Sequence, residues 1–208
     1  FELQNVDGTN INSTNFTTYS SGGIINRIYQ ITTEYTTAQL FDLKFAQSAD
    51  VMYLCHPDHE PMKLSRTGHT SWSLTEVDFG TDGPYFDANT TATTITPQQT
   101  AAATGKTLTL SATTGVNNNQ GWLTTDVGRI VKFNGGTAKI TSRTNSTVAV
   151  ATIVDAFTNT NATAAFQLGS FSDTNGFPSS VSFFEQRLVF AATNDQPQTI
   201  FFSKSGDY

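Results

Sequence analysis

The sequence predicts an all-β fold, and two features carry that prediction. Thr is the commonest residue, at 36 of 208, and Phe contributes 16 and Tyr 6; branched and aromatic side chains suit the pleated, half-buried surface of a sheet. Apolar residues also gather in short runs that end at Gly, Pro or Asn, as strands do. The only helical candidate lies in residues 35–48, where Thr36 or Thr37 is placed to cap one or two turns before strand-like alternation begins.

Residues 1–90 are expected to form the first part of an outer β-domain. After a polar, turn-rich start, a strand is expected at 24–33. A buried strand is expected at 50–56, and the runs at 61–66 and 70–79 are expected to pair as a hairpin.

Residues 91–163 are expected to form a small inserted β-domain, either a barrel or a sandwich. The composition changes over residues 80–105, where turn residues and then Thr and Ala replace periodic apolar residues. Asn134-Gly135 and Asn145-Ser146 are hairpin signals. They separate members of a series of short strands expected at 106–112, 128–133, 138–144 and 147–154.

Residues 164–208 are expected to complete the outer domain, with an aromatic hairpin from 178–194 and 198–205. Its blade-like hairpins leave part of a propeller open as the architecture. Consecutive aromatic residues in a strand face both sides of the sheet, so one side fills a core and the other needs a cover. The cover is either the rest of this chain or a neighbouring subunit. The candidate interface residues are Phe184, Arg187, Phe201 and Phe202, and Arg187 is expected to form a bidentate pair with a carboxylate.

Charge and cysteine content disfavour several classes of protein. Eleven basic and seventeen acidic residues give a net charge of −6, which leaves little to build the basic face of a nucleic-acid binder. The single cysteine, Cys55, excludes an internal disulfide and a four-cysteine zinc site. The sequence contains no apolar run approaching the length of a membrane span, and the first residues lack a signal-peptide pattern.

No catalytic, cofactor-binding or metal site is predicted, and the chain is not expected to be an enzyme. The run CHPDHE at 55–60 holds metal-ligating residue types, but neighbouring strand residues point to opposite faces and Pro57 forces a turn. Ser65, His69 and Asp78 are the residue types of a hydrolytic triad, without the nucleophile elbow that exposes a reactive serine. The number of glycosylation sequons is about what the Asn and Ser/Thr content gives by chance. They lie at Asn12, Asn15, Asn89, Asn145 and Asn161.

Two segments, residues 40–74 and 169–208, resemble the nozzle proteins of short-tailed bacteriophages, also described as tail tubular protein B or phage stabilisation proteins. Residues 126–129 (DVGR) resemble the variable middle of that family more loosely, and residues 1–30 do not carry the resemblance. The matching motifs are FAQSAD (45–50), HP (56–57), FEQRL (184–188) and SKSGDY (203–208).

The resemblance implies a structural protein of the virion. Such nozzles are β-rich subunits with propeller-like parts. They assemble into sixfold rings at the distal end of the tail beside other tail proteins such as an adaptor, and they retain DNA and later let it pass. The family supplies no catalytic residue. Its members are longer than 208 residues, and this chain starts within a strand-like run and stops immediately after another, so we expect a fragment or a processed product.

Two other classes of function remain open at this stage. The first is a carbohydrate- or receptor-binding module, in which Trp72, Trp122 or Tyr85 stacks on a sugar. The second is a hydrolase of cell-wall or capsule polymers. That class needs a pair of carboxylates, and no such pair is evident among the acidic residues of the sequence.

Overall fold

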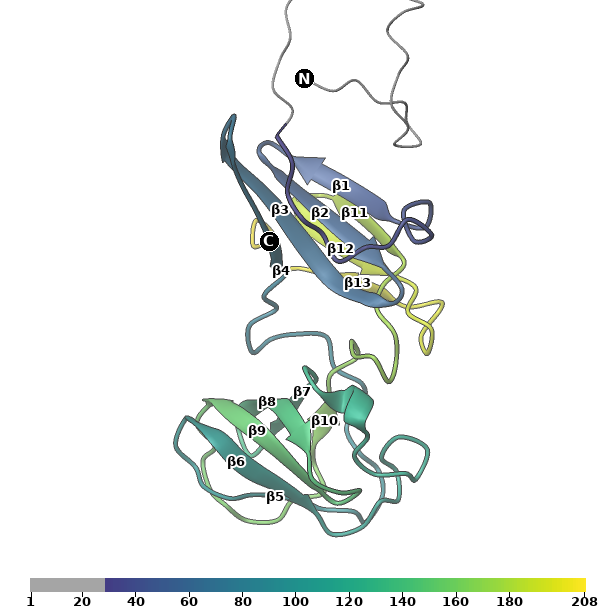
Figure 1. Ribbon diagram of the computed structural model, residues 1–208. Coiled ribbons are helices and arrows are strands. Elements are labelled where there is room, and N and C mark those ends of the chain that lie inside the picture. Colours follow the sequence, from purple (N-terminus) through teal and green to yellow (C-terminus); the bar gives the residue numbers. More distant parts are fainter. Residues whose placement is uncertain (1–28) are drawn as a thin grey trace, which may run out of the picture. The chain divides into compact units, whose positions relative to one another are not determined.

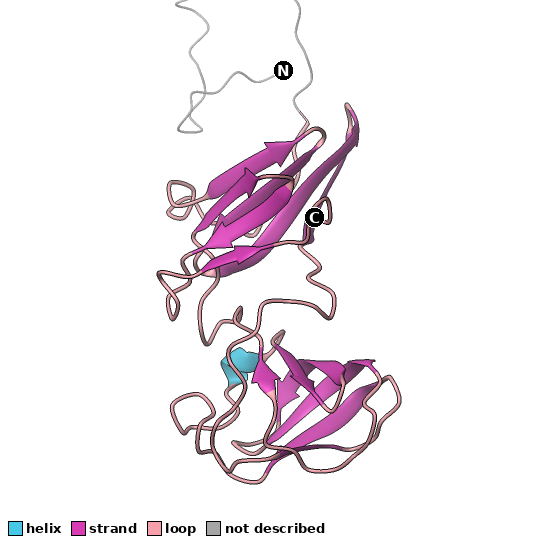
Figure 2. Ribbon diagram, turned by 180° about the vertical axis from the view of Figure 1, so that it is seen from behind, coloured by secondary structure: helices cyan, strands magenta, loops and turns pink. Residues whose placement is uncertain are grey.

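The all-β prediction is confirmed. The computed structural model describes residues 29–208, which form thirteen strands in three antiparallel sheets and one short 3₁₀ helix, η2 (Thr124–Asp126) (Figures 1 and 2). The first sheet is a four-stranded meander of β1 (Lys44–Ser48), β2 (Val51–His56), β3 (His59–Gly68) and β4 (Ser71–Glu76).

The third sheet, a meander of β11 (Ser180–Phe184), β12 (Arg187–Ala191) and β13 (Ile200–Phe202), packs against the first. In Figure 1 the yellow-green strands of the third sheet lie against the blue strands of the first. We call this pair of sheets the sandwich. Its buried core consists of Tyr53, Cys55, Val181, Leu188 and Phe190.

The second sheet has six strands and a core of its own, which includes Trp122. Register shifts interrupt the pairing of two strand pairs, and such bulges bend a sheet. We call this unit the middle sheet. Its spatial order is β10 (Gln167–Leu168), β7 (Ile130–Phe133), β8 (Gly136–Arg143), β9 (Val148–Asp155), β6 (Ala103–Leu110) and β5 (Ile95–Pro97).

The sandwich joins segments that are far apart in the sequence. Strands β1–β4 precede the middle sheet and β11–β13 follow it, yet both contribute to one core. The domain boundaries at 90/91 and 163/164 stay a prediction. Phe86, Phe166 and Leu168, outside the range 91–163, also pack in or against the core of the middle sheet.

Several expected strands and turns are confirmed. The hairpin of β3 and β4 pairs Leu64 with Leu74. Asn134 and Gly135, with φ of 45° and 71°, connect β7 to β8 as a two-residue turn with both residues left-handed, the geometry for which Asn-Gly is favoured.

The helix expected within residues 35–48 is wrong. Two successive turns replace it, with Gln39 N donating to Thr36 O (3.0 Å) and Asp42 N donating to Gln39 O (3.1 Å). The Thr36 hydroxyl donates to the Gln39 side chain (3.0 Å) and does not cap first-turn amides. Of the strand expected at 24–33, residues 24–28 lie outside the described residues, and residues 29–33 form no strand.

Candidate functional site

The surface of β11–β13 that faces away from the sandwich core is rich in exposed apolar side chains, and we call it the outer face. Phe184, Ile200 and Phe202 are 58%, 57% and 55% exposed. Phe202 pairs across the sheet with Val189, which is half-buried. Because side chains alternate along a strand, these residues share one side of the sheet.

The opposite side of the same strands faces the core. Phe201 packs edge-on against Phe171, with ring centroids 5.0 Å apart, and Phe183 packs edge-on against Tyr53 at 5.9 Å. Of the four interface residues named from the sequence, the structure therefore places Phe184 and Phe202 on the outer face and Phe201 in the core.

Arg187 contacts the end of the chain. Its Nη1 donates to the carbonyl of Ser203 (2.8 Å), and the Ser203 hydroxyl accepts from Leu188 N (2.9 Å). Gly206 N donates to the carbonyl of Gln186 (2.7 Å). Hydrogen bonds thus hold residues 203–208 against the β11–β12 turn. Among the described residues the acceptor found for Arg187 is a backbone carbonyl, and the bidentate carboxylate pair expected for it stays a prediction.

A second feature is a buried ion pair beside η2. The side chains of Asp126 and Arg129 are 0% and 2% exposed, and Arg129 Nη1 donates to Asp126 Oδ1 (2.9 Å). Desolvation lowers the pKa of Arg129, and the negative charge of Asp126 opposes that shift. A guanidinium stays charged in proteins, so the pair is ionic.

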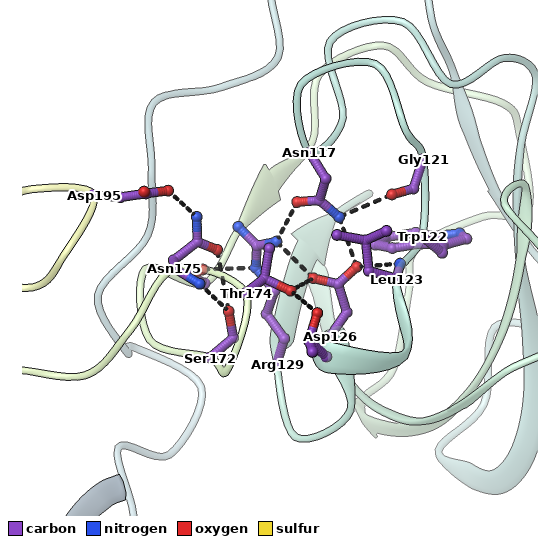
Figure 3. A network of polar contacts seen from close by, with 12 residues as sticks. Asn117, Gly121, Trp122, Leu123, Asp126, Arg129, Ser172, Thr174, Asn175 and Asp195 are labelled. Atoms are coloured by element: carbon purple, nitrogen blue, oxygen red, sulfur yellow. Dashed lines mark hydrogen bonds and ion pairs between the residues drawn. The ribbon is translucent and has the colours of Figure 1, made fainter. Parts of the chain in front are cut away.

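Surrounding groups satisfy most of the remaining hydrogen-bonding capacity of the pair (Figure 3). Arg129 Nε donates to Gly169 O (2.8 Å), and Arg129 Nη1 also donates to Asn117 Oδ1 (2.8 Å). Asp126 accepts from the Asn117 amide (2.6 Å), from Leu123 N (2.8 Å) and from the Thr174 hydroxyl (2.9 Å). The network therefore links η2 to the segment that leads into β11.

Asn117 belongs to a strained turn. Asn117, Asn118 and Asn119 have φ of 47°, 53° and 69°, and three consecutive non-glycine residues in the left-handed region are unusual. The turn borders a cleft of about 390 Å³ that Arg129 also lines. Side-chain amides and carboxylates predominate around this cleft.

A third feature is a pair of carboxyl groups, Glu60 on β3 and Glu76 on β4. Burial, together with a hydrogen bond to Glu76, raises the pKa of Glu60 to about 7. Lys139 Nζ lies 3.6 Å from Glu76. Glu60 thus binds a proton below about neutral pH.

The aromatic residues named for sugar stacking are not all available. Trp122 is fully buried in the core of the middle sheet, so the expectation that it stacks on a ligand is wrong. Tyr85 is half-buried, and its hydroxyl donates to Thr81 O (2.9 Å). Trp72 is 37% exposed, and the Arg66 guanidinium lies 5.8 Å from the centre of its ring.

The other motifs considered from the sequence have local contacts. Cys55 lies in the sandwich core, where burial raises the pKa of its thiol to about 12. Within residues 29–208, no three His, Cys, Asp or Glu side chains lie close enough together to hold a metal ion. His69 Nδ1 lies 3.2 Å from Arg66 Nη2, and Asp78 accepts from Gly80 N (2.8 Å).

Sequence reasoning missed the ion pair and the cleft. The DVGR motif contains both charged residues, three positions apart, but an Asp and an Arg at that spacing usually lie in a solvated turn. The run of three Asn residues at 117–119 was the available signal, because Asn tolerates the left-handed region better than other side chains.

Comparison of the sequence with models of known protein families and with curated proteins finds no match. In the described part of the chain, no helix has the length and apolar character needed to cross a membrane.

Proposed function

We propose that this chain is a structural subunit of a bacteriophage tail nozzle, which associates with copies of itself into a ring. The observation that carries the proposal is the outer face, with Phe184, Ile200 and Phe202 all more than half exposed. The ring retains DNA and later lets it pass, and its other partners are tail proteins such as an adaptor.

The two segments that resemble nozzle proteins support the proposal by their place in the fold. Residues 40–74 contribute β1–β3 and most of β4, and residues 169–208 contribute β11–β13, so together they make up most of the sandwich. The FEQRL motif forms the β11–β12 turn, and the SKSGDY motif is hydrogen-bonded to it. Both motifs thus lie beside the outer face.

Burial of the outer face against a second subunit would stabilise an assembly. Complete burial of a Phe side chain contributes about 1.5–3 kcal/mol, and several such side chains share this one surface. The acidic balance of the chain, with a net charge of −6, suits a conduit that does not retain DNA phosphates.

The proposal is tested by the solution mass of Phe202→Asp, measured by light scattering beside the wild type. A charge in the centre of an apolar contact is costly to bury, so we expect an oligomer for the wild type and a monomer for the variant. Circular dichroism checks that the variant is folded. Should Phe202→Asp fail to fold, Phe202→Ser replaces it.

The matched control is Val154→Asp, which changes an exposed apolar residue on β9 in the middle sheet. We expect this control to assemble as the wild type does. Assembly of both Phe202→Asp and Phe184→Asp at wild-type strength would refute the outer face as the contact surface.

A further inference from the structure

We propose that the cleft beside Arg129 binds a neutral polyhydroxylated ligand, such as a hexose unit of a glycan. This inference goes beyond assembly, and it rests on the network of Figure 3 rather than on the outer face. The cleft volume of about 390 Å³ lies within the range of small-molecule sites. Its polar lining includes Asp87, Asn118, Gln120, Asn175 and Asp195.

Arg129 provides a donor that no residue in the described part of the chain uses. Its Nε and Nη1 donate to Gly169, Asn117 and Asp126, whereas no described residue accepts from Nη2. The side chain is 2% exposed and lines the cleft. Nη2 is therefore free to donate to an oxygen atom of a ligand in the cleft, and a hydrogen bond from a charged donor is among the stronger ones.

The strained turn presents further polar groups to the same cleft. Asn117 is held by Arg129 and Asp126, and Asn119 accepts from Gly115 N (2.8 Å). Between them, Asn118 lines the cleft and is exposed, and its side chain makes no hydrogen bond to another described residue. Non-glycine residues held in the left-handed backbone region are found more often at ligand-binding sites than elsewhere.

The charges around the cleft select the class of ligand. Asp126 neutralises Arg129, and Asp87 and Asp195 then leave the cleft negative, so phosphate and other anions are repelled. Amides and carboxylates offer both acceptors and donors at short range, which suits hydroxyl groups that donate and accept. Phe86 adds an apolar surface beside them.

The test is saturation-transfer NMR with the full chain. The probes are glucose, galactose, mannose, N-acetylglucosamine and maltose, each at millimolar concentration, and inorganic phosphate is followed separately by chemical-shift changes. We expect transfer to at least one sugar, loss of that transfer in Gln120→Ala and Asp195→Asn, and no effect of phosphate.

Both variants change exposed residues that line the cleft, and Asp173→Asn, at an exposed residue outside the lining, is the matched control that should bind as the wild type does. Absence of transfer to every sugar, or transfer unchanged in both cleft variants, would overturn the proposal. Phosphate-induced shifts of cleft residues without sugar binding would also overturn it. Light scattering of the same samples reports assembly separately, so failure of one proposal is distinguished from failure of the other.

Discussion

Arg129 illustrates how one residue holds two parts of the fold. It binds Asp126 and Asn117 on the side of the middle sheet and the carbonyl of Gly169 on the way to β11. Removal of one partner from a buried ion pair leaves an uncompensated charge, which costs about 3–5 kcal/mol. We therefore expect Arg129→Ala to lower the free energy of unfolding by about that amount, measured by urea denaturation.

An exposed ion pair is the control for this prediction. Arg66 Nη1 lies 2.9 Å from Asp50 Oδ1, but the Asp50 side chain is 64% exposed. Such pairs contribute about 0–1 kcal/mol, so Asp50→Ala should change stability little. Equal losses in the two variants would show that burial of the Asp126–Arg129 pair has no energetic consequence.

Glu60 makes stability depend on pH. Its pKa rises from an ordinary 4.5 to about 7 in the folded chain, so between these values the folded state binds more protons than the unfolded state. The free energy of unfolding therefore falls as pH rises from about 4.5 to about 7, and it is level above that. Because the side chain is only half-buried, we expect a fall of about 1 kcal/mol after screening by solvent.

Glu60→Gln removes the titrating group and isolates its effect. Urea unfolding at pH 5 and pH 8 should show a smaller difference for Glu60→Gln than for the wild type, with the variant the more stable at pH 8. A wild-type chain that is more stable at pH 8 than at pH 5, with the variant showing the same trend, would contradict the assignment.

At the scale of elements, the β11–β12 turn is strained by its sequence. Glu185 and Gln186 have φ of 45° and 60°, although neither residue type favours the left-handed region. The β7–β8 turn uses Asn134 and Gly135 for the same geometry. We expect the double change Glu185→Asn and Gln186→Gly to stabilise the chain by about 1 kcal/mol, seen as a higher melting temperature.

The reverse exchange is the matched control for that turn. Gly135→Gln should destabilise the chain, because a Cβ at position 135 would lie 3.0 Å from Thr158 Cγ2 in addition to the backbone strain. A melting temperature that falls on introduction of Asn-Gly at 185–186 would mean that the Glu and Gln side chains stabilise the turn in a way that backbone geometry does not explain.

The two turns also show what the sequence is able to predict. The Asn134-Gly135 pair predicts its hairpin because both residue types tolerate the left-handed backbone geometry of the turn. Glu185-Gln186 gives no such signal, and the hairpin there was predicted from apolar runs alone. The helix expected within 35–48 failed because the Thr36 hydroxyl bonds the Gln39 side chain and leaves the first-turn amides uncapped.

The candidate sites were predicted only in part for a related reason. Alternation within a strand correctly separates Phe201 from Phe202 onto opposite sides of a sheet, but it does not reveal which side is the core. The Asp126–Arg129 network depends on Gly169 and Thr174, which are distant in sequence. Contacts of that kind follow from the tertiary fold, and local patterns do not contain them.

For the whole molecule, the sandwich forms from segments that precede and follow the middle sheet in the sequence. Its third sheet has one side in the core and one exposed side, so the same substitution should change the stability of the chain differently on the two sides. Phe201 packs on Phe171 in the core and Phe202 is 55% exposed. We expect Phe201→Ala to cost about 3 kcal/mol and Phe202→Ala to leave the stability of the isolated chain nearly unchanged, by urea unfolding of monomeric samples. Equal costs would contradict the assignment of the two faces.

The claim that this chain is a ring-forming structural subunit is tested most directly by the solution mass of the wild type, with negative-stain images of the same sample. We expect a defined oligomer that appears as rings of one symmetry, and the resemblance to nozzle proteins implies a sixfold ring. A monomer at all accessible concentrations, with no rings in the images, would contradict it.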